Sequence, residues 1–457
     1  MKYAILILST ISFVFPVSGQ QAKWTSLFDG KTLKGWNQKN GNASFQVEKG
    51  QIVGTTVANS PNSFLCTDAT YGDFILELEI MAETHMNSGV QFRSLSSPEY
   101  QAGRVHGYQM EVDATPRAWS GGIYDEARRD WLYIPEVNPA GKKAFQIGKW
   151  NKYRIEAIGN TIRTWINGQP VAHLIDNMTA EGFIALQVHG IYGNMKEGMQ
   201  IRWKNIRIQT KQLKASPPDQ IPVVNLLPNH LSEQEKSLGF KLLFNGADFS
   251  GWRGVHAKEM PAKHWMIEKD AIKVSSSDGS ETGNDIVTEE AFSAFELVFE
   301  FKLTEGANSG VKYFVDESFD SGGKSGIGLE YQLLDDEKHP DAKQGVVGNR
   351  TLASLYDLIP SEKPEKRFTK KIGEWNQARL RVYPDHTVQH WLNGFKVVEY
   401  QRKSNIFKAL VARSKYEKWN GFGMNDQGPI LLQDHGDTVF FRSIKIRILT
   451  ESPIVCH

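Results

Sequence analysis

The chain reads Thr161-Ile-Arg-Thr-Trp-Ile-Asn-Gly168, a run of alternating apolar residues that ends in an Asn-Gly pair. Alternation with a period of two predicts a β-strand buried on one face. Asn-Gly predicts a tight turn, because both residues tolerate the positive φ that a two-residue hairpin requires. The same pattern returns at Trp391-Leu-Asn-Gly394, before Phe395-Lys-Val397. The sequence therefore predicts an antiparallel hairpin at two places in the chain.

This repeated hairpin belongs to a longer series of motifs that occur twice in the same order. The opening motif Ser26-Leu-Phe-Asp-Gly-Lys-Thr-Leu-Lys-Gly-Trp36 returns at Leu242-Leu-Phe-Asn-Gly-Ala-Asp-Phe-Ser-Gly-Trp252. Further matches join Asn87-Ser-Gly-Val90 to Asn308-Ser-Gly-Val311, and Leu186-Gln-Val-His-Gly190 to Leu432-Gln-Asp-His-Gly436. A duplicated domain explains this order, with loop insertions in the second copy.

Both copies are predicted to consist of strands. Period-two runs occupy residues 74–80, 153–158, 161–166 and 201–208 of the first copy, and no run predicts a helix of ordinary length. Many short antiparallel strands joined by Gly and Asn turns favour an all-β fold of two tandem jelly-roll β-sandwiches. A closed barrel is the weaker alternative.

The domain boundaries follow from the segments around the repeats. Residues 1–19 carry Lys2, an apolar run and small residues, the order typical of a signal peptide, so we expect a periplasmic or secreted protein. The first sandwich is expected at residues 20–210, a Pro-rich linker at 211–231 and the second sandwich at 232–457. Ser232 and Glu235 have the spacing of a capping box, which predicts a short helix ending near Gly239.

Composition excludes several classes of function. The 457 residues include 53 Lys and Arg against 52 Asp and Glu, so no excess of positive charge favours nucleic acid. No later apolar run is long enough to span a membrane. Two cysteines, Cys66 and Cys456, provide neither a disulfide scaffold nor a CxxC metal site. The motifs of hydrolase elbows, zincins, nucleotide-binding loops and laminarinase-type active strands are also missing. The oligomeric state is left open.

Polar residues alternate along one predicted strand of each copy. Gln109, Glu111 and Asp113 share one face in the first copy, and Glu330 and Gln332 share the corresponding face in the second. Each strand thus carries an amide and a carboxylate on one face, and their order along the strand is reversed between the two copies. This pattern predicts that the face lines a polar groove; a solvated outer sheet face is the alternative.

The Asn-Ser-Gly motifs and the His-Gly pairs are further candidates. Gly89 and Gly310 permit close approach of a ligand, or serve a tight bulge. His189 and His435 each end a strand, and we place the preceding glutamine of each on the opposite strand face. An unperturbed imidazole titrates near pH 6.5, which suits a base.

Together these motifs resemble the 3-keto-disaccharide hydrolase domain family. The resemblance rests on residues 27–36, Asn87-Ser-Gly89, Gly107-Tyr-Gln-Met-Glu111, Trp150-Asn151, Asn167-Gly168, 187–190 and Trp203-Lys-Asn-Ile-Arg207. It covers about 23–210 and 239–449. It implies a concanavalin A-like jelly roll, carbohydrate as the ligand and cleavage of glycosides already oxidised at C3.

That reaction assigns roles to the candidates, because a ketone at C3 acidifies the proton on C2. His189 and His435 are the candidate bases. The candidates to stabilise the C3 oxygen are Gln109, Arg93, Lys312 and Gln332. Glu111, Asp113, Glu330 and Asp335 are candidates to orient a histidine, and Asp113 and Asp335 to hold a divalent ion. The expected substrate-binding residues are Asn87, Tyr124, Gln187, Asn308, Tyr356 and Gln433.

Two alternatives to a doubly active enzyme stay open. Jelly rolls serve as lectins as readily as enzymes, so a non-catalytic carbohydrate-binding protein is one alternative. One catalytic and one binding copy is the other, because the copies differ at Val188 and Asp434 and at Arg93 and Phe314.

Overall fold

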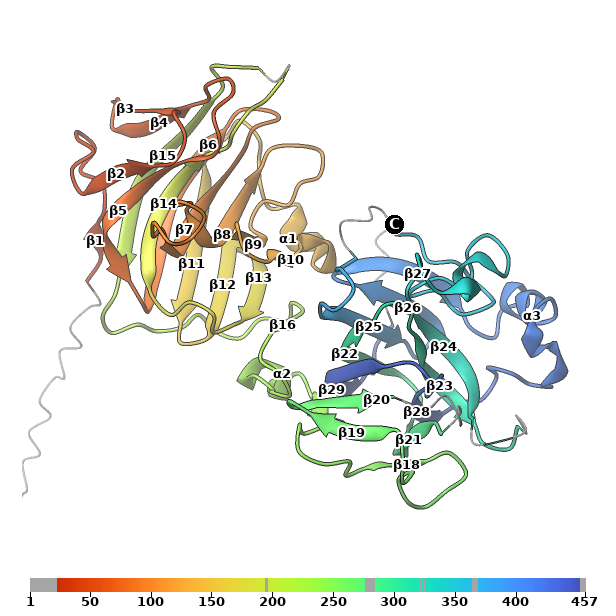
Figure 1. Cartoon of the computed structure of the whole chain (residues 1–457). Helices are drawn as coiled ribbons and strands as arrows, with labels where there is room; N and C mark the ends of the chain where they lie inside the picture. Colours follow the sequence, from red (N-terminus) through yellow and green to blue (C-terminus); the bar gives the residue numbers. More distant parts are fainter. Residues whose placement is uncertain are drawn as a thin grey trace, which may run out of the picture.

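The computed structural model describes residues 23–193, 196–275, 284–319, 323, 325–363 and 369–452. The predicted signal peptide and Cys456 lie outside the described residues. The described chain forms two β-sandwiches, coloured red to yellow-green and green to blue in Figure 1. The predicted all-β tandem fold is confirmed. No helix in the described ranges is long and apolar enough to cross a membrane.

The first domain packs a nine-stranded sheet against a seven-stranded sheet. The nine-stranded sheet has the order β16 (Val224–Asn225), β13 (Gln169–Ile175), β12 (Thr161–Ile166), β11 (Asn151–Ile158), β6 (Phe74–Ala82), β15 (Gln200–Gln209), β4 (Gln51–Thr55), β3 (Ser44–Glu48), with β1 (Thr25–Ser26) beside β15. The seven-stranded sheet has the order β10 (Asp130–Tyr133), β9 (Ile123–Glu126), β8 (His106–Asp113), β7 (Asn87–Leu95), β14 (Gly182–Val188), β5 (Ser63–Tyr71), β2 (Trp36–Lys39). The short helices η1 (Pro135–Val137) and α1 (Pro139–Lys142) follow β10.

The second domain repeats this architecture with an eight-stranded and a five-stranded sheet. The larger sheet has the order β19 (Trp265–Glu268), β20 (Ala271–Val274), β29 (Val439–Ile448), β22 (Phe295–Leu303), β25 (Asn376–Val382), β26 (Thr387–Leu392), β27 (Phe395–Gln401), with β17 (Lys241–Leu242) beside β29. The smaller sheet has the order β18 (Trp252–Gly254), β21 (Ile286–Phe292), β28 (Gly428–Leu432), β23 (Asn308–Asp316), β24 (Ile327–Leu334). The short helices of the second domain are α2 (Glu233–Ser237), η2 (Pro340–Lys343), α3 (Asn405–Val411) and η4 (Lys415–Lys418).

Local predictions agree with the backbone. Asn167 and Gly168 have φ values of 53° and 84° between β12 and β13, and Asn393 and Gly394 have 48° and 88° between β26 and β27. Positive φ at both central residues is the geometry of a two-residue hairpin turn, so both predicted hairpins are confirmed.

The segment between the repeats joins the fold of the first domain. Within the stretch expected as a linker, β16 pairs in parallel with β13. Helix α2 follows, and its Ser232–Glu235 capping box is present as predicted. In Figure 1 both elements lie between the two sandwiches.

The alternation along β8 decides which face of the seven-stranded sheet is polar. Tyr108, Met110 and Val112 are fully buried in the hydrophobic core between the two sheets. Gln109 and Glu111 therefore lie on the other face of the same strand.

Candidate functional site

Pairing between strands gathers the polar residues of the first domain on one face. Glu111 of β8 lies opposite Gly89 of β7, and Gly89 lies opposite Gln187 of β14. Residues opposite one another in an antiparallel pair project to the same face. Gln109 and Glu111 are only 2% and 3% exposed, so this face is not the solvated surface considered as the alternative. We call this buried polar face the first groove, after the polar groove that the sequence predicts.

A chain of hydrogen bonds orders the side chains of the first groove. Gln91 Nε2 donates to Gln109 Oε1 at 2.7 Å, and Gln109 Nε2 donates to Glu111 Oε2 at 2.8 Å. Asn87 Nδ2 donates to Glu111 Oε1 at 2.5 Å. The Cβ of any other residue at position 89 would lie 2.3 Å from Gln109 Cδ, so a glycine there leaves room for the glutamine. The structure thus brings the predicted residues Asn87, Gln109 and Glu111 together and adds Gln91, which was not among the candidates.

Glu111 is the carboxyl group most strongly affected by its surroundings in the first groove. Burial raises its pKa to about 8, although Arg117 and the amides of Asn87 and Gln109 act in the opposite direction. Desolvation disfavours the charged carboxylate more than these neighbours favour it. Burial therefore favours the protonated form of Glu111 toward neutral pH.

Arg117 is a groove residue that the sequence analysis missed. Its Nη2 lies 3.3 Å from Glu111 Oε1, and its Nε donates to Asp113 Oδ2 at 2.7 Å. The guanidinium carbon lies 4.7 Å and 5.2 Å from the ring centroids of Trp119 and Trp131. The available signal was a repeated pattern, because Arg117 precedes Tyr124-Asp125 as Arg350 precedes Tyr356-Asp357.

His189 lies at the end of β14, beside this cation. Its Nδ1 is 2.7 Å from the carbonyl oxygen of Gly190. A carbonyl can only accept, so Nδ1 carries the proton and the Nε2 lone pair remains available. Burial lowers the pKa of His189; the Gly190 bond raises it and Arg117 lowers it further. His189 is therefore neutral at pH 7, as a base requires.

The glutamine before this histidine corrects one expectation. Gln187 lies on the groove face through its pairing with Gly89, not on the opposite face from His189. Residues two apart on a strand point to the same side, so Gln187 and His189 belong together. Gln187 Oε1 is buried and has no hydrogen-bond partner among the described residues. An acceptor in this state is available to a ligand hydroxyl.

The second domain has a corresponding face, the second groove. Gly310 lies opposite Gln332, and Lys312 lies opposite Glu330, so the amide and the carboxylate are exchanged relative to the first groove. Gln433 donates its backbone N–H to the Gly310 carbonyl, so it occupies the position in the second domain that Gln187 occupies in the first. The Oε1 atoms of Gln332 and Gln433 are buried without a partner in the described chain.

Two lysines approach Glu330, and they differ in what they bind. Glu330 is 4% exposed, and no described residue donates a hydrogen bond to its carboxylate. Lys312 Nζ donates to the Gly326 carbonyl at 2.9 Å and lies 3.6 Å from Asp285, so its charge is already paired. Lys415 Nζ lies 4.1 Å from the ring centroid of Tyr356. Lys415 is exposed as a whole, but partial desolvation of its ammonium group lowers its pKa, while Glu330 raises it and Lys312 lowers it.

Lys415 is a residue of the second groove that the sequence patterns did not identify. It comes from a loop that joins β27 to β28 over residues 402–427, whereas β13 and β14 of the first domain are joined by residues 176–181 alone. The backbone N–H of Lys415 donates to Asp357 Oδ2 at 2.9 Å, which fixes the loop beside Tyr356. The signal in the sequence was that this loop is much longer in the second repeat than in the first.

The remaining predicted residues lie around the two grooves. Tyr124 pairs with Gln109 across β8 and β9, and Tyr356 donates its backbone N–H to the Glu330 carbonyl. Asn308 Oδ1 accepts from Gln332 Nε2 at 3.4 Å. His435 is exposed at the end of the second groove, with its ring centroid 6.3 Å from that of His339.

Arg93 does not belong to the first groove, which corrects its expected role. Its guanidinium donates to the carbonyl oxygens of Gly72 and Gly159 and to Asp73, each at 2.9 Å. The register of β7 and β8 shifts after Phe92, so the alternation that would place Arg93 beside the groove is broken. Arg93 ties two turns together instead.

Asp113 and Asp335 do not fit the expected divalent ion. Asp113 accepts hydrogen bonds from Thr115 N and Oγ1, Arg117 Nε and Trp119 N. Asp335 accepts from the backbone N–H groups of Gly306, Glu337 and Lys338. Both carboxylates thus hold loops at strand ends, and no group of three or more His, Cys, Asp or Glu in the described ranges is placed to hold a metal.

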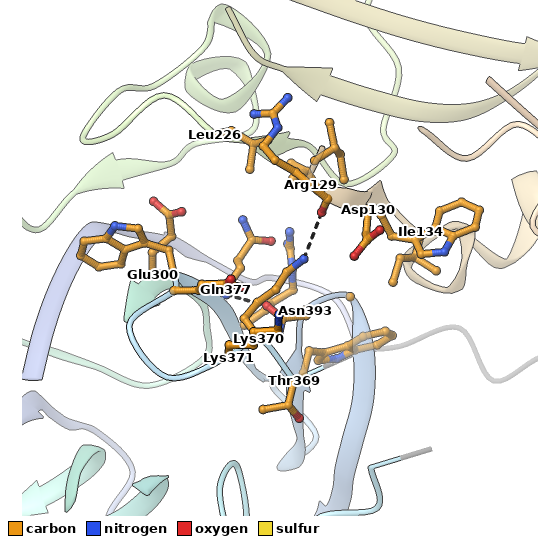
Figure 2. Close-up of a pocket in the computed structure, with 18 of the residues that line it drawn as sticks. Arg129, Asp130, Ile134, Leu226, Glu300, Thr369, Lys370, Lys371, Gln377 and Asn393 are labelled. Atoms are coloured by element: carbon orange, nitrogen blue, oxygen red, sulfur yellow. Dashed lines mark hydrogen bonds between the residues drawn. The ribbon is translucent and has the colours of Figure 1, made fainter. Parts of the chain in front are cut away.

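A pocket of about 980 Å³ lies between the two domains. Arg129, Asp130 and Trp131 line it from the first domain, and Lys371, Gln377 and Trp391 line it from the second. Figure 2 shows Lys370 reaching across to the Arg129 carbonyl, at 3.3 Å. Trp131 also contacts Tyr124 and Arg117, so the pocket borders the first groove.

Each of three known proteins matches about half of the chain. A 3-keto-disaccharide hydrolase of Bacteroides thetaiotaomicron is 39% identical over 233 residues, which are 46% of this chain and 79% of the relative. A crystal structure from Parabacteroides distasonis, described as a glycosyl hydrolase, is 32% identical with a TM-score of 0.43 and covers 49% of this chain and 100% of its own. A second structure from the same organism, with the same description, is 25% identical with a TM-score of 0.34 and covers 46% and 99%. Residues 23–209 and 239–447 both match the 3-keto-alpha-glucoside-1,2-lyase-like domain, so the chain belongs to that family and carries its domain twice.

Proposed function

We propose that this chain is an exported carbohydrate-active hydrolase that cleaves 3-keto-glycosides by elimination and hydration. The observation that carries the proposal is the state of His189, whose Nδ1–H donates to Gly190 and leaves Nε2 free to take a proton beside Arg117. The 39% identity to a 3-keto-disaccharide hydrolase supports the substrate class. The apolar run and small residues within 1–19 support export.

The reaction begins with loss of the proton on C2 of the keto sugar. The electron pair of the C2–H bond forms an enolate whose charge rests on the C3 oxygen. That pair then forms the C1=C2 double bond while the C1–O bond breaks, and the departing alkoxide takes a proton. Water adds its hydroxyl to C1 and its proton to C2. The net change is hydrolysis, with the C3 ketone restored.

The first groove has a group for each of these steps, and in the hydration step the ionised Glu111 takes a proton from water while the protonated His189 returns one to C2. His189 Nε2 is the base, because its pKa lies below its ordinary value and it is neutral at pH 7. Arg117 and the Gln109 amide stabilise the charge on the C3 oxygen. Glu111, whose protonated form burial favours, supplies its proton to the departing alkoxide. The unpaired Gln187 Oε1 accepts a hydrogen bond from a sugar hydroxyl.

The second groove performs the same roles with different side chains. His435 is the base at the corresponding strand end. Lys415 supplies the cation, because Lys312 is already paired with Gly326 and Asp285. The unpaired Oε1 atoms of Gln332 and Gln433 bind sugar hydroxyls.

Product release from 3-keto-cellobiose and from unoxidised cellobiose tests the proposal. Release of glucose from the keto substrate alone supports it. Binding of both sugars without release contradicts it and favours the lectin-like alternative. If each single histidine variant still releases product and the double variant does not, both domains are active. If one single variant alone loses product release, one domain is catalytic and the other binds.

A further inference from the structure

We propose that the pocket between the domains binds the leaving group of a substrate whose keto sugar lies in the first groove, and that this leaving group is a neutral saccharide. The inference rests on the proposed function for the identity of the keto sugar. It gives the second domain a part in the specificity of the first.

The pocket is continuous with the first groove along the sheet. Trp131 of β10 lies opposite Tyr124 of β9, and Tyr124 lies opposite Gln109 of β8. All three side chains therefore project from the same face of the seven-stranded sheet. Trp131 also lines the pocket. A ligand that extends from Glu111 past Tyr124 toward the β10 edge thus reaches the space between the domains.

The short contacts along this path place the chemistry next to the pocket. Glu111 lies 3.3 Å from the Arg117 guanidinium, which in turn lies 5.2 Å from the Trp131 ring centroid. Glu111 is the residue that protonates the departing oxygen in the first groove. The group attached to that oxygen is therefore directed toward Trp131 and the pocket beyond it.

The lining of the pocket suits a sugar better than an ion. Its four arginines are already paired with carboxylates, Arg128 and Arg129 with Asp125, Arg379 with Glu296 and Arg442 with Glu300. Lys370 donates to the Arg129 carbonyl, and Lys371 is exposed to solvent. Indole rings lie beside amide groups, from Trp131, Trp391, Gln377 and Asn393. A neutral sugar presents apolar C–H faces together with hydroxyl groups, and a mixed lining of rings and a few polar groups matches both.

Contacts between the domains hold the two walls of the pocket together. The rings of Trp119 and Phe395 lie 5.7 Å apart, and Trp119 and Ile134 are buried within the core cluster of the second domain. Arg379 donates to the Val223 carbonyl at 3.3 Å. The second domain thus forms a fixed wall beside the first groove.

Filling the pocket from the second domain tests the proposal. Gln377→Trp is introduced in the full-length chain together with His435→Asn, so that only the first groove can act. We expect kcat/KM for 3-keto-cellobiose to fall by about tenfold or more, while kcat/KM for methyl 3-keto-glucoside, whose leaving group is small, stays within about twofold. Gln377→Ala gives a smaller effect in the same direction. Gln401→Trp, an exposed position of β27 outside the pocket, is the matched control.

Other results contradict the proposal. Equal losses on both substrates mean that the substitution disturbs the groove itself, and no loss on either means that the pocket does not contact the leaving group. If the parent protein cleaves neither keto substrate, the proposed function fails. The pocket is then tested by titrating tryptophan fluorescence with unoxidised cellobiose, and an affinity that Gln377→Trp leaves unchanged overturns the inference.

Discussion

The guanidinium of Arg117 lies 3.3 Å from Glu111 Oε1 and joins a buried carboxyl group to the aromatic wall of the first groove. Burial nevertheless raises the pKa of Glu111 to about 8. The folded domain therefore holds this proton more tightly than the unfolded chain, in which the ordinary value of 4.5 applies. The contribution to stability is full below pH 4.5 and is lost as the pH rises to about 8.

Our first prediction is that Glu111→Gln removes the pH dependence of stability that Glu111 causes. The free energy of unfolding of the wild-type protein is expected to fall relative to that of the variant between pH 5 and pH 9, by on the order of a few kcal/mol. Denaturant titrations at the two pH values measure the difference. Glu99→Gln, at an exposed position, is the control and follows the wild type. A constant difference between wild type and Glu111→Gln would show that Glu111 is ionised throughout.

Replacement of both histidines is expected to abolish catalysis. His189→Asn with His435→Asn removes the proposed bases, so product release from 3-keto-cellobiose should fall by about 10²–10⁴-fold. Affinity for unoxidised cellobiose, measured by calorimetry, should stay within about threefold, because binding depends on the amides of the grooves. His230→Asn, at an exposed position between the domains, serves as the control. Unchanged release in the double variant would remove both histidines from the mechanism.

The pH profile of the first groove depends on Arg117. In the His435→Asn protein the acid limb of kcat/KM reports His189, whose pKa is lowered by burial and by Arg117, so activity is expected to persist below pH 6.5. Arg117→Met removes one of these two causes, and the acid limb should move toward higher pH. The same variant should lower kcat, because a cation near the C3 oxygen is lost. An acid limb at the same pH in both proteins would contradict the assignment of His189 as the base.

The fold was largely predictable because it depends on local patterns. Each Asn-Gly pair determines the hairpin around it, and the repeated motifs determine the duplication. Two members of the polar cluster were also predictable, since alternation along β8 places Gln109 and Glu111 on one face.

Other features of the site depend on contacts that no local pattern contains. Arg93 lies outside the first groove because a register shift after Phe92 breaks the alternation along β7. Arg117 and Lys415 reach the grooves from loops, whose course is determined by tertiary contacts such as the hydrogen bond from Lys415 N to Asp357. The pocket between the domains depends on how the two domains pack against each other, which a repeat alone does not specify.

The glycine below each groove is expected to matter for activity more than for stability. A Cβ at Gly89 would lie 2.3 Å from Gln109 Cδ, and a Cβ at Gly310 would lie 2.3 Å from Glu330 Oε1. Both obstacles are side-chain atoms that can move, so Gly89→Ala and Gly310→Ala should each cost only about 1 kcal/mol. The displaced groups no longer face the sugar, so kcat/KM on 3-keto-cellobiose should fall by about tenfold or more when the other groove is disabled. Gly72→Ala is the matched control, because Gly72, like Gly89 and Gly310, does not have a left-handed φ, and its Cβ would meet only the Ala180 carbonyl oxygen, at 3.6 Å. Equal losses of stability and activity would show that the glycines serve packing alone.

Lys415 is expected to be the catalytic cation of the second groove. Lys415→Met in the His189→Asn background removes the one unpaired cation among Lys312, Arg350 and Lys415, because Lys312 remains paired with Asp285 and Arg350 with Asp341 and Asp357. Removal of one group that stabilises an oxyanion costs about 10²–10³-fold in kcat, and Lys415→Arg should restore part of it. Lys418→Met, on the same short helix but over Trp419, is the matched control and should retain full activity. KM should change little in Lys415→Met, because the charge on the C3 oxygen develops only during the reaction. A rise in KM with kcat unchanged would instead assign Lys415 to binding, and Lys312 would then be the cation to test.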